Sequence, residues 1–147
     1  MLRDVLIFVG GYDPNNERDY EQVTSFKLNR FRFTDPTSAY TGMIMGGVIN
    51  ALDYDIIFVA WDDGGADLFE NGRVVANAIQ HINRIKAEAG VCSESVVIGQ
   101  SMGGLCTKIG LSLLEDEGVD HRISKYVSWD TPHEGANVPV NLQAMSA

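Results

Sequence analysis

Short, mostly apolar runs alternate along the chain with longer stretches that have helical periodicity. Each run is followed by glycine or aspartate, and the four runs span residues 5–9, 56–61, 96–98 and 126–129. Runs of this length, rich in β-branched residues, are typical of central parallel strands that are covered on both faces. The pattern therefore predicts four strands of one parallel sheet.

Helical periodicity fills the intervals between these runs. Residues 73–89 and 102–117 repeat apolar side chains with a period near 3.6, and Asn71 is a candidate cap for the first helix. Residues 39–52 form a weaker helical segment because they include three glycines. Alternation of strands and helices predicts an α/β domain, in which right-handed crossovers place helices on both faces of a parallel sheet.

The alternation is interrupted by an insertion at about residues 13–36 and by a tail from residue 133 onward. Within the insertion, residues 26–28 and 31–33 can be written as a hairpin with Phe26 opposite Phe33. Asn29-Arg30 is a poor two-residue turn, because arginine resists positive φ, so the hairpin remains one of two interpretations. Phe26, Phe31, Phe33 and Tyr40 are candidates either for an acyl pocket or for the core.

Composition narrows the class of protein. A chain of 147 residues with 45% hydrophobic and 21% charged residues fits one globular domain. Eleven basic against 20 acidic residues give a net charge of −9, which disfavours nucleic acid as a partner. The longest apolar run, residues 56–61, is far shorter than the roughly 20 residues of a membrane span. Cys92 and Cys106 have no metal-ligand spacing, and both are expected to be small buried packing residues.

The clearest chemical motif is Gly99-Gln100-Ser101-Met102-Gly103, which lies between a predicted strand and a predicted helix. This setting is the one in which a G-x-S-x-G turn presents a nucleophilic serine. A side chain at Gly99 or Gly103 is expected to collide with a neighbouring strand or helix. The turn also places Ser101 at a helix N-terminus, where developing negative charge is stabilised. We therefore expect strained backbone angles at Ser101.

A second motif, Gly10-Gly11-Tyr12, follows the first predicted strand. A tetrahedral oxyanion needs about two N–H donors within about 3 Å. We expect these donors to be the backbone N–H groups of Met102 and Tyr12, and we expect the glycines to let the backbone approach the substrate. This interpretation requires Tyr12, Ser101 and Asp130 to meet at one edge of the sheet.

With residues 10–14, 63–67, 99–104 and 130–139 taken together, the chain resembles the serine α/β-hydrolases, most closely lipase- or esterase-like hydrolases of bacteria. The resemblance covers nearly the whole chain. It implies a Ser-acid-His triad, a covalent acyl-enzyme, a small-molecule or lipid-like acyl substrate, and no metal or organic cofactor. Many look-alikes are exported, but the first residues here lack the features of a signal peptide, and no location is assigned.

The resemblance also implies that a histidine and several further strands follow the Gly99–Gly103 turn, which we call the serine elbow. Only 46 residues follow Ser101 here, too few for all of these elements. We therefore expect residues 1–147 to be a single, partial hydrolase domain, incomplete on its C-terminal side. The expected consequences are a nearly inactive chain and an exposed sheet edge at residues 126–129 that pairs with another copy.

Candidates for the remaining triad positions are few. Asp130 follows the fourth predicted strand and is the candidate acid; the alternative is that it braces its loop. Of the three histidines, His81 and His121 are expected at the surface, and His133 is the candidate base, with shaping of its loop as the alternative. Acidic residues at 62–67 match no full calcium loop, so no metal site is assigned. A non-catalytic protein that uses the same fold is the competing interpretation.

Overall fold

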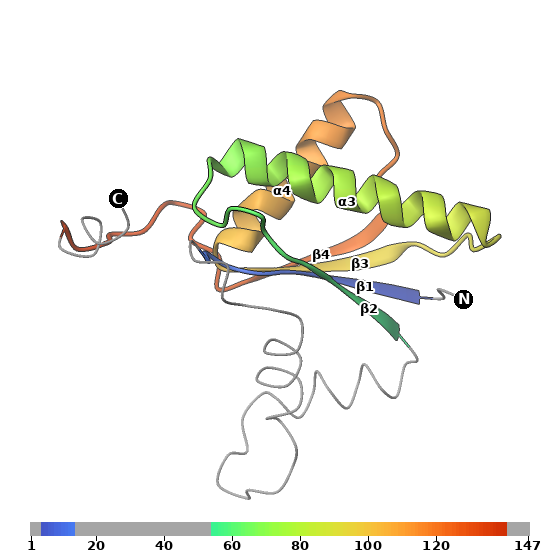
Figure 1. Cartoon of the computed structure of the whole chain (residues 1–147), viewed down its shortest axis with the longest axis horizontal. Helices are drawn as coiled ribbons and strands as arrows, with labels where there is room; N and C mark the ends of the chain where they lie inside the picture. Colours follow the sequence, from blue (N-terminus) through green and yellow to red (C-terminus); the bar gives the residue numbers. More distant parts are fainter. Residues whose placement is uncertain (1–3, 14–53, 141–147) are drawn as a thin grey trace, which may run out of the picture.

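The computed structural model describes residues 4–13 and 54–140. These residues form a sheet of four parallel strands: β1 (Asp4–Val9), β2 (Tyr54–Val59), β3 (Ser95–Gln100) and β4 (Ile123–Trp129). Helix α3 (Leu68–Glu88) joins β2 to β3, and helix α4 (Met102–Asp116) joins β3 to β4. The chain is therefore an α/β protein, and the prediction of one parallel sheet is confirmed (Figure 1).

The strand order in space is β2-β1-β3-β4, so β1 and β3 lie side by side at the centre. The chain leaves β1 toward β2 on one side, and later continues from β3 to β4 on the other. Ligands of open α/β sheets bind outside the carboxyl ends of strands at such a reversal. The register pairs Val9 with Gly99 and Gln100 with Trp129, which brings the carboxyl ends of β1, β3 and β4 together.

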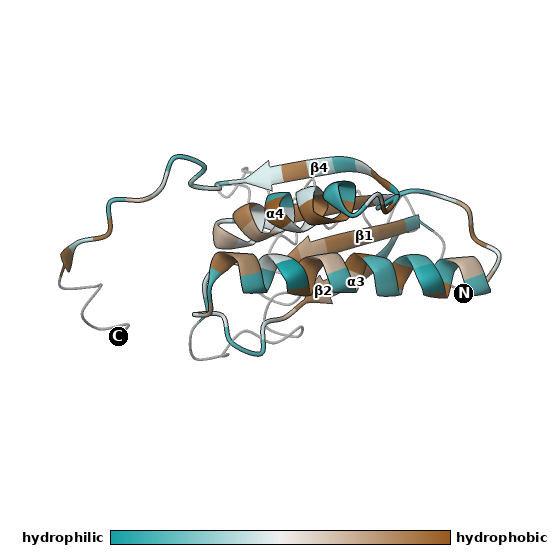
Figure 2. Ribbon diagram, turned by 90° about the horizontal axis from the view of Figure 1, so that it is seen from above, coloured by the Kyte–Doolittle hydropathy of each residue, from teal (hydrophilic) through white to brown (hydrophobic). Residues whose placement is uncertain are grey.

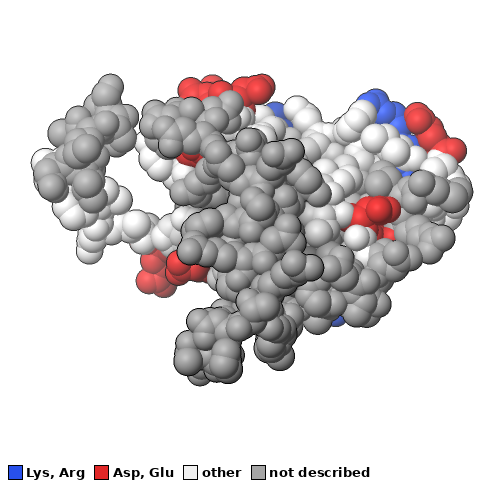
Figure 3. Space-filling view, turned by 60° about the horizontal axis from the view of Figure 1, so that its bottom comes forward, with Lys and Arg blue, Asp and Glu red and all other residues white. Residues whose placement is uncertain are grey.

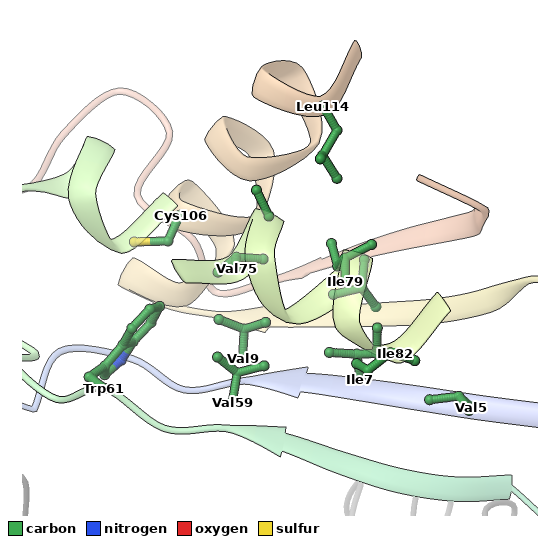
Figure 4. Close-up of a cluster of buried hydrophobic side chains, with 12 residues drawn as sticks. Val5, Ile7, Val9, Val59, Trp61, Val75, Ile79, Ile82, Cys106 and Leu114 are labelled. Atoms are coloured by element: carbon green, nitrogen blue, oxygen red, sulfur yellow. The ribbon is translucent and has the colours of Figure 1, made fainter. Parts of the chain in front are cut away.

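Both described helices lie on the same face of the sheet (Figure 1). The main core fills the space between them and the strands, and Figure 4 shows its side chains converging from both layers. Alternate residues of β1 point into this core, and helix α3 contributes side chains from one face, so teal and brown alternate along it in Figure 2. The buried members include Val5, Ile7, Val9, Val75 and Ile79.

The opposite face of the sheet carries a second, smaller cluster of buried side chains, namely Leu6, Phe8 and Ile98. The rings of Phe8 and Phe58 stack there with centroids 5.7 Å apart. The predicted helix at 39–52, the insertion beyond residue 13, the hairpin at 26–33 and the candidate pocket aromatics lie outside the described residues. Coverage of both faces by helices therefore stays a prediction, and the described helices account for one face.

Three sequence-based expectations differ from the structure. Helix α3 begins five residues earlier than predicted, because Asp67 and not Asn71 is its cap: the Asp67 carboxylate accepts a hydrogen bond from the N–H of Phe69. The strand predicted at 56–61 ends at Val59, so Trp61 lies beyond it. The burial expected of Cys92 is wrong, because its thiol lies on an exposed connection between α3 and β3.

The end of the sheet opposite the candidate site holds a buried cation. The Lys86 ammonium donates to the carbonyl oxygen of Ser93 at 2.6 Å and to the Ser95 hydroxyl at 3.0 Å. Burial lowers the pKa of Lys86, and the positive charge of Arg122 lowers it further. None of the helices in the described ranges combines the length and apolarity needed to cross a membrane.

Candidate active site

Ser101 occupies the sharp turn between β3 and α4, with φ 52° and ψ −125°. This conformation is unfavourable for a residue with a Cβ atom and persists only where the surroundings impose it. Two hydrogen bonds hold the turn: the Ser101 N–H donates to the carbonyl oxygen of Trp129 at 2.9 Å, and the Gly104 N–H donates to the carbonyl oxygen of Ser101 at 3.0 Å. The predicted outlying backbone between a strand and a helix is confirmed.

The motif glycines let the helix pack directly onto the strands. A methyl group at Gly99 would lie 2.5 Å from the Cα of Gly104 in α4, and one at Gly103 would overlap the carbonyl oxygens of Gly10 and Val9 at the end of β1. Both neighbours are main-chain atoms, which cannot move away as a flexible side chain can. The collisions expected from the sequence are therefore confirmed, with the helix at Gly99 and with the strand at Gly103.

Gly11 brings the loop after β1 into direct contact with the serine. A Cβ at Gly11 would lie 3.1 Å from the Cβ of Ser101 and 3.6 Å from its Oγ. On the other side of the loop, the indole N–H of the buried Trp61 donates to the carbonyl oxygen of Gly11 at 3.1 Å. The loop is thus held between a core tryptophan and the serine, and Tyr12 lies at the same end of the sheet as Ser101, as predicted.

Backbone donors are available beside the Ser101 hydroxyl. Met102 is the first residue of α4, so its N–H is one of the groups that a helix leaves without an internal partner. The Ser101 side chain makes no capping hydrogen bond to the helix, and its hydroxyl bonds to none of the residues in the described ranges. The positive end of the α4 dipole faces this position. The arrangement can stabilise negative charge that develops next to Oγ.

The segment after β4 closes the third side of the site. Asp130 follows β4 directly, as Ser101 follows β3, and has a positive φ of 51°. The next residue, Thr131, packs its side chain against Gly104, and its hydroxyl lies 3.4 Å from the carbonyl oxygen of Gly99. The Tyr126 hydroxyl donates to the carbonyl oxygen of Gly104 at 2.7 Å. These contacts hold Asp130 at the same sheet edge as Ser101, and its role as the acid stays a prediction.

All three histidines fall in the described part of the chain, and there none of them is hydrogen-bonded to Ser101. His133 Nε2 lies 2.7 Å from the Ser128 hydroxyl on the exposed edge of β4. Nδ1 of His81 contacts Arg84, and Nδ1 of His121 accepts the N–H of Ile123. His81 is exposed, as expected, and His121 is half-buried, with its side chain 23% exposed. The assignment of His133 as base stays a prediction.

The acidic loop before α3 uses its carboxylates to order its own backbone. One Asp63 oxygen accepts the N–H of Gly65 at 2.8 Å, and Asp67 caps α3. Across residues 4–13 and 54–140, no group of three or more histidine, cysteine, aspartate or glutamate side chains is arranged to hold a metal ion. The loop positions the start of α3 above the candidate site.

Cys106, one turn into α4, is a buried thiol near the serine elbow. Burial raises its pKa to about 11, so the group is a neutral thiol at physiological pH. In Figure 4 its sulfur lies in the core at the same end of the sheet as Trp61. Cys106 therefore packs helix α4 and is not a reactive thiol.

Sequence reasoning missed two functional contacts of this site. The sequence pattern places Trp61 in a strand and gives Thr131, within residues 130–139, no role of its own. Only the fold shows that Trp61 reaches Gly11 across 50 positions and that Thr131 covers Gly104. A signal for Trp61 is its place at the end of an apolar run, since a buried indole N–H requires an acceptor.

Charge on the described surface is mainly acidic and dispersed. On the face shown in Figure 3, red acidic groups occur at several separate places, while blue basic groups gather mainly toward one end. Comparison of the chain with protein-family models, with curated proteins and with solved structures finds no match. The interpretation of the site therefore depends on its own geometry.

Proposed function

We propose that this chain is a serine hydrolase of the α/β-hydrolase type, which cleaves an ester or related acyl bond through Ser101. The observation that carries the proposal is the backbone of Ser101 at φ 52° and ψ −125°, between β3 and α4, with Gly11 against its side chain. Strain of this kind at a serine beside the first N–H groups of a helix is what presentation of a nucleophile requires.

In the proposed reaction, the Ser101 Oγ attacks the carbonyl carbon and forms a C–O bond. A general base takes the hydroxyl proton and later gives it to the leaving alkoxide as the ester C–O bond breaks. The N–H groups of Met102 and Tyr12 donate to the oxyanion of the tetrahedral intermediate. Water then attacks the acyl-enzyme, releases the acid and restores the serine.

An uncharged acyl substrate fits the surroundings of Ser101 best. Tyr12, an aromatic residue that is 44% exposed, lies at the same end of the sheet as Ser101. The net charge of −9 disfavours the approach of polyanions. We therefore assign a small-molecule or lipid-like ester as the substrate class and expect no nucleic acid partner.

The general base is the part of the proposal that the described residues do not supply, since none of the histidines there is hydrogen-bonded to Ser101. Without a base the serine hydroxyl is a weak nucleophile. Enzymes that lose a triad member retain about 10³–10⁴-fold catalysis from the oxyanion hole and binding. Added imidazole, which diffuses freely, can take the proton in place of a histidine.

The test is phosphonylation of the 147-residue chain by a fluorophosphonate probe, with and without imidazole, followed by intact mass spectrometry and peptide mapping. The Oγ–P bond forms as the P–F bond breaks, fluoride leaves and imidazole takes the proton. We expect one adduct on Ser101, formed faster with imidazole, and none in Ser101→Ala. Ser112→Ala, at an exposed serine of α4, is the matched control and should label as the wild type does. An adduct spread over several residues would contradict the proposal.

One observation favours a second candidate, a binding protein that keeps the fold without turnover. The candidate base, His133, lies with its Nε2 2.7 Å from the Ser128 hydroxyl and not beside Ser101. If the chain is such a binding protein, we expect the fluorophosphonate to leave Ser101 unmodified even at a high imidazole concentration. The same experiment therefore separates the two functions.

A further inference from the structure

The hydrogen bond from Trp61 to Gly11 has a consequence for the oxyanion hole. Peptide bonds in the described residues are trans. The C=O of Gly11 and the N–H of Tyr12 belong to the same peptide group, so they lie in one plane and point in opposite directions. Trp61 holds the C=O on the side of the core beneath α3. The N–H of Tyr12 is therefore turned away from that core.

This peptide needs an external restraint. Gly10 and Gly11 precede Tyr12, and two successive glycines leave the backbone free to rotate because neither has a Cβ. A flip of the Gly11–Tyr12 peptide would exchange its ends and present a carbonyl oxygen where the N–H had been. An oxygen dipole there would repel an oxyanion at Ser101, since Gly11 is in contact with the serine side chain.

On the basis of the proposed function, we propose that Trp61 is a positioning residue of the oxyanion hole, whose indole N–H fixes the Gly11–Tyr12 peptide with its N–H toward the developing oxyanion. Trp61 is suited to this role because its ring is 4% exposed and is packed in the main core. The restraint thus comes from a rigid side chain, and Figure 4 places that side chain beyond the carboxyl ends of β1 and β2. Trp61 touches no reacting atom and acts through Gly11.

The test compares the wild type with Trp61→Phe, which keeps an aromatic ring and removes the N–H donor. Fluorophosphonate labelling of the full chain in imidazole is measured over a range of probe concentrations, giving a saturation constant and a maximal rate. Loss of a whole oxyanion donor costs about 10²–10³-fold in rate. We expect the maximal rate to fall about 10-fold or more in Trp61→Phe, with the saturation constant unchanged.

Two further proteins make the result specific to the N–H group. Replacement of Trp61 by 3-benzothienylalanine exchanges the N–H for sulfur in a ring of nearly the same shape, so packing is kept. If Trp61→Phe unfolds, this variant alone tests whether the N–H group sets the labelling rate. Asn83→Ala is the control, because it removes a side-chain hydrogen bond of similar length, 2.8 Å to the carbonyl oxygen of His121, elsewhere in the protein. It should label at the wild-type rate.

The outcomes separate the two proposals. A lower maximal rate in the benzothienyl protein, with the melting temperature and saturation constant kept, supports positioning by the N–H. Labelling of that protein at the wild-type rate overturns the role of Trp61 and leaves the proposed function intact. Absence of labelling at Ser101 in the wild type overturns the proposed function and, with it, the role of Trp61.

Discussion

The strain at Ser101 predicts an unusual ranking of two substitutions. Ser101→Ala keeps a Cβ atom at φ 52° and ψ −125°, whereas Ser101→Gly removes it. A residue with a side chain in such a region costs about 1–3 kcal/mol. Removing the side chain relieves this cost, but glycine also makes the unfolded chain more flexible, which takes back about 0.5–1 kcal/mol of the gain in stability. We therefore expect Ser101→Gly to exceed Ser101→Ala in free energy of unfolding by about 1–2 kcal/mol.

The measurement is urea unfolding followed by far-UV circular dichroism, with melting temperatures as a second readout. For a domain of this size the expected difference corresponds to about 2–8 °C in Tm. Ser112, on an exposed turn of α4, supplies the matched pair: there the order should reverse, with Ser112→Gly about 1 kcal/mol less stable than Ser112→Ala. If Ser101→Ala proves as stable as Ser101→Gly, the backbone at Ser101 is relaxed and the elbow interpretation is refuted.

Three further results are expected. Gly103→Ala should lower the free energy of unfolding in urea by about 2 kcal/mol. Overlap of the new methyl group with the Gly10 carbonyl costs about 3 kcal/mol, and the higher helix propensity of alanine returns about 1 kcal/mol. A variant as stable as the wild type would show that α4 can move off β1. With a thiol reagent at pH 8, Cys92 should react quickly and Cys106 only on unfolding, since burial raises the pKa of Cys106; rapid reaction of both would contradict that burial. Folding lowers the pKa of Lys86 from its ordinary value of 10.5. At pH values just below 10.5, the unfolded chain therefore binds more protons than the folded chain does. Wild-type stability should therefore rise relative to Lys86→Met as the pH increases through that window, and a constant difference in unfolding free energy would refute the shift.

Local patterns in the sequence predicted the sheet well. The strand predicted at 5–9 gains one residue in the structure and the strand predicted at 96–98 gains three, because an apolar run that ends in glycine has few alternatives once helices flank it. The elbow was equally accessible, since the spacing of two glycines around Ser101 specifies both the turn and the close packing of the helix. The four strands and the turn that holds Ser101 therefore follow from short-range information.

The contacts that complete the site depend on the fold. The bond from Trp61 to Gly11 joins residues 50 positions apart, and the cover of Thr131 over Gly104 joins the segment after β4 to helix α4. The start of α3 was misplaced because Asp67 and Asn71 are both good caps, and the choice depends on where the preceding loop ends. Burial of Cys92 was misjudged because residue type alone does not place a side chain on a connection.

We propose that Ser101 lies in an oxyanion hole formed by two backbone N–H groups. The most direct measurement is a crystal structure of the chain after reaction with a fluorophosphonate in imidazole. We predict a phosphonyl group on the Ser101 Oγ, with its phosphoryl oxygen about 2.7–3.1 Å from both the Tyr12 and the Met102 nitrogens. An adduct on Ser101 whose phosphoryl oxygen points to solvent, or an adduct on another residue, would contradict the account.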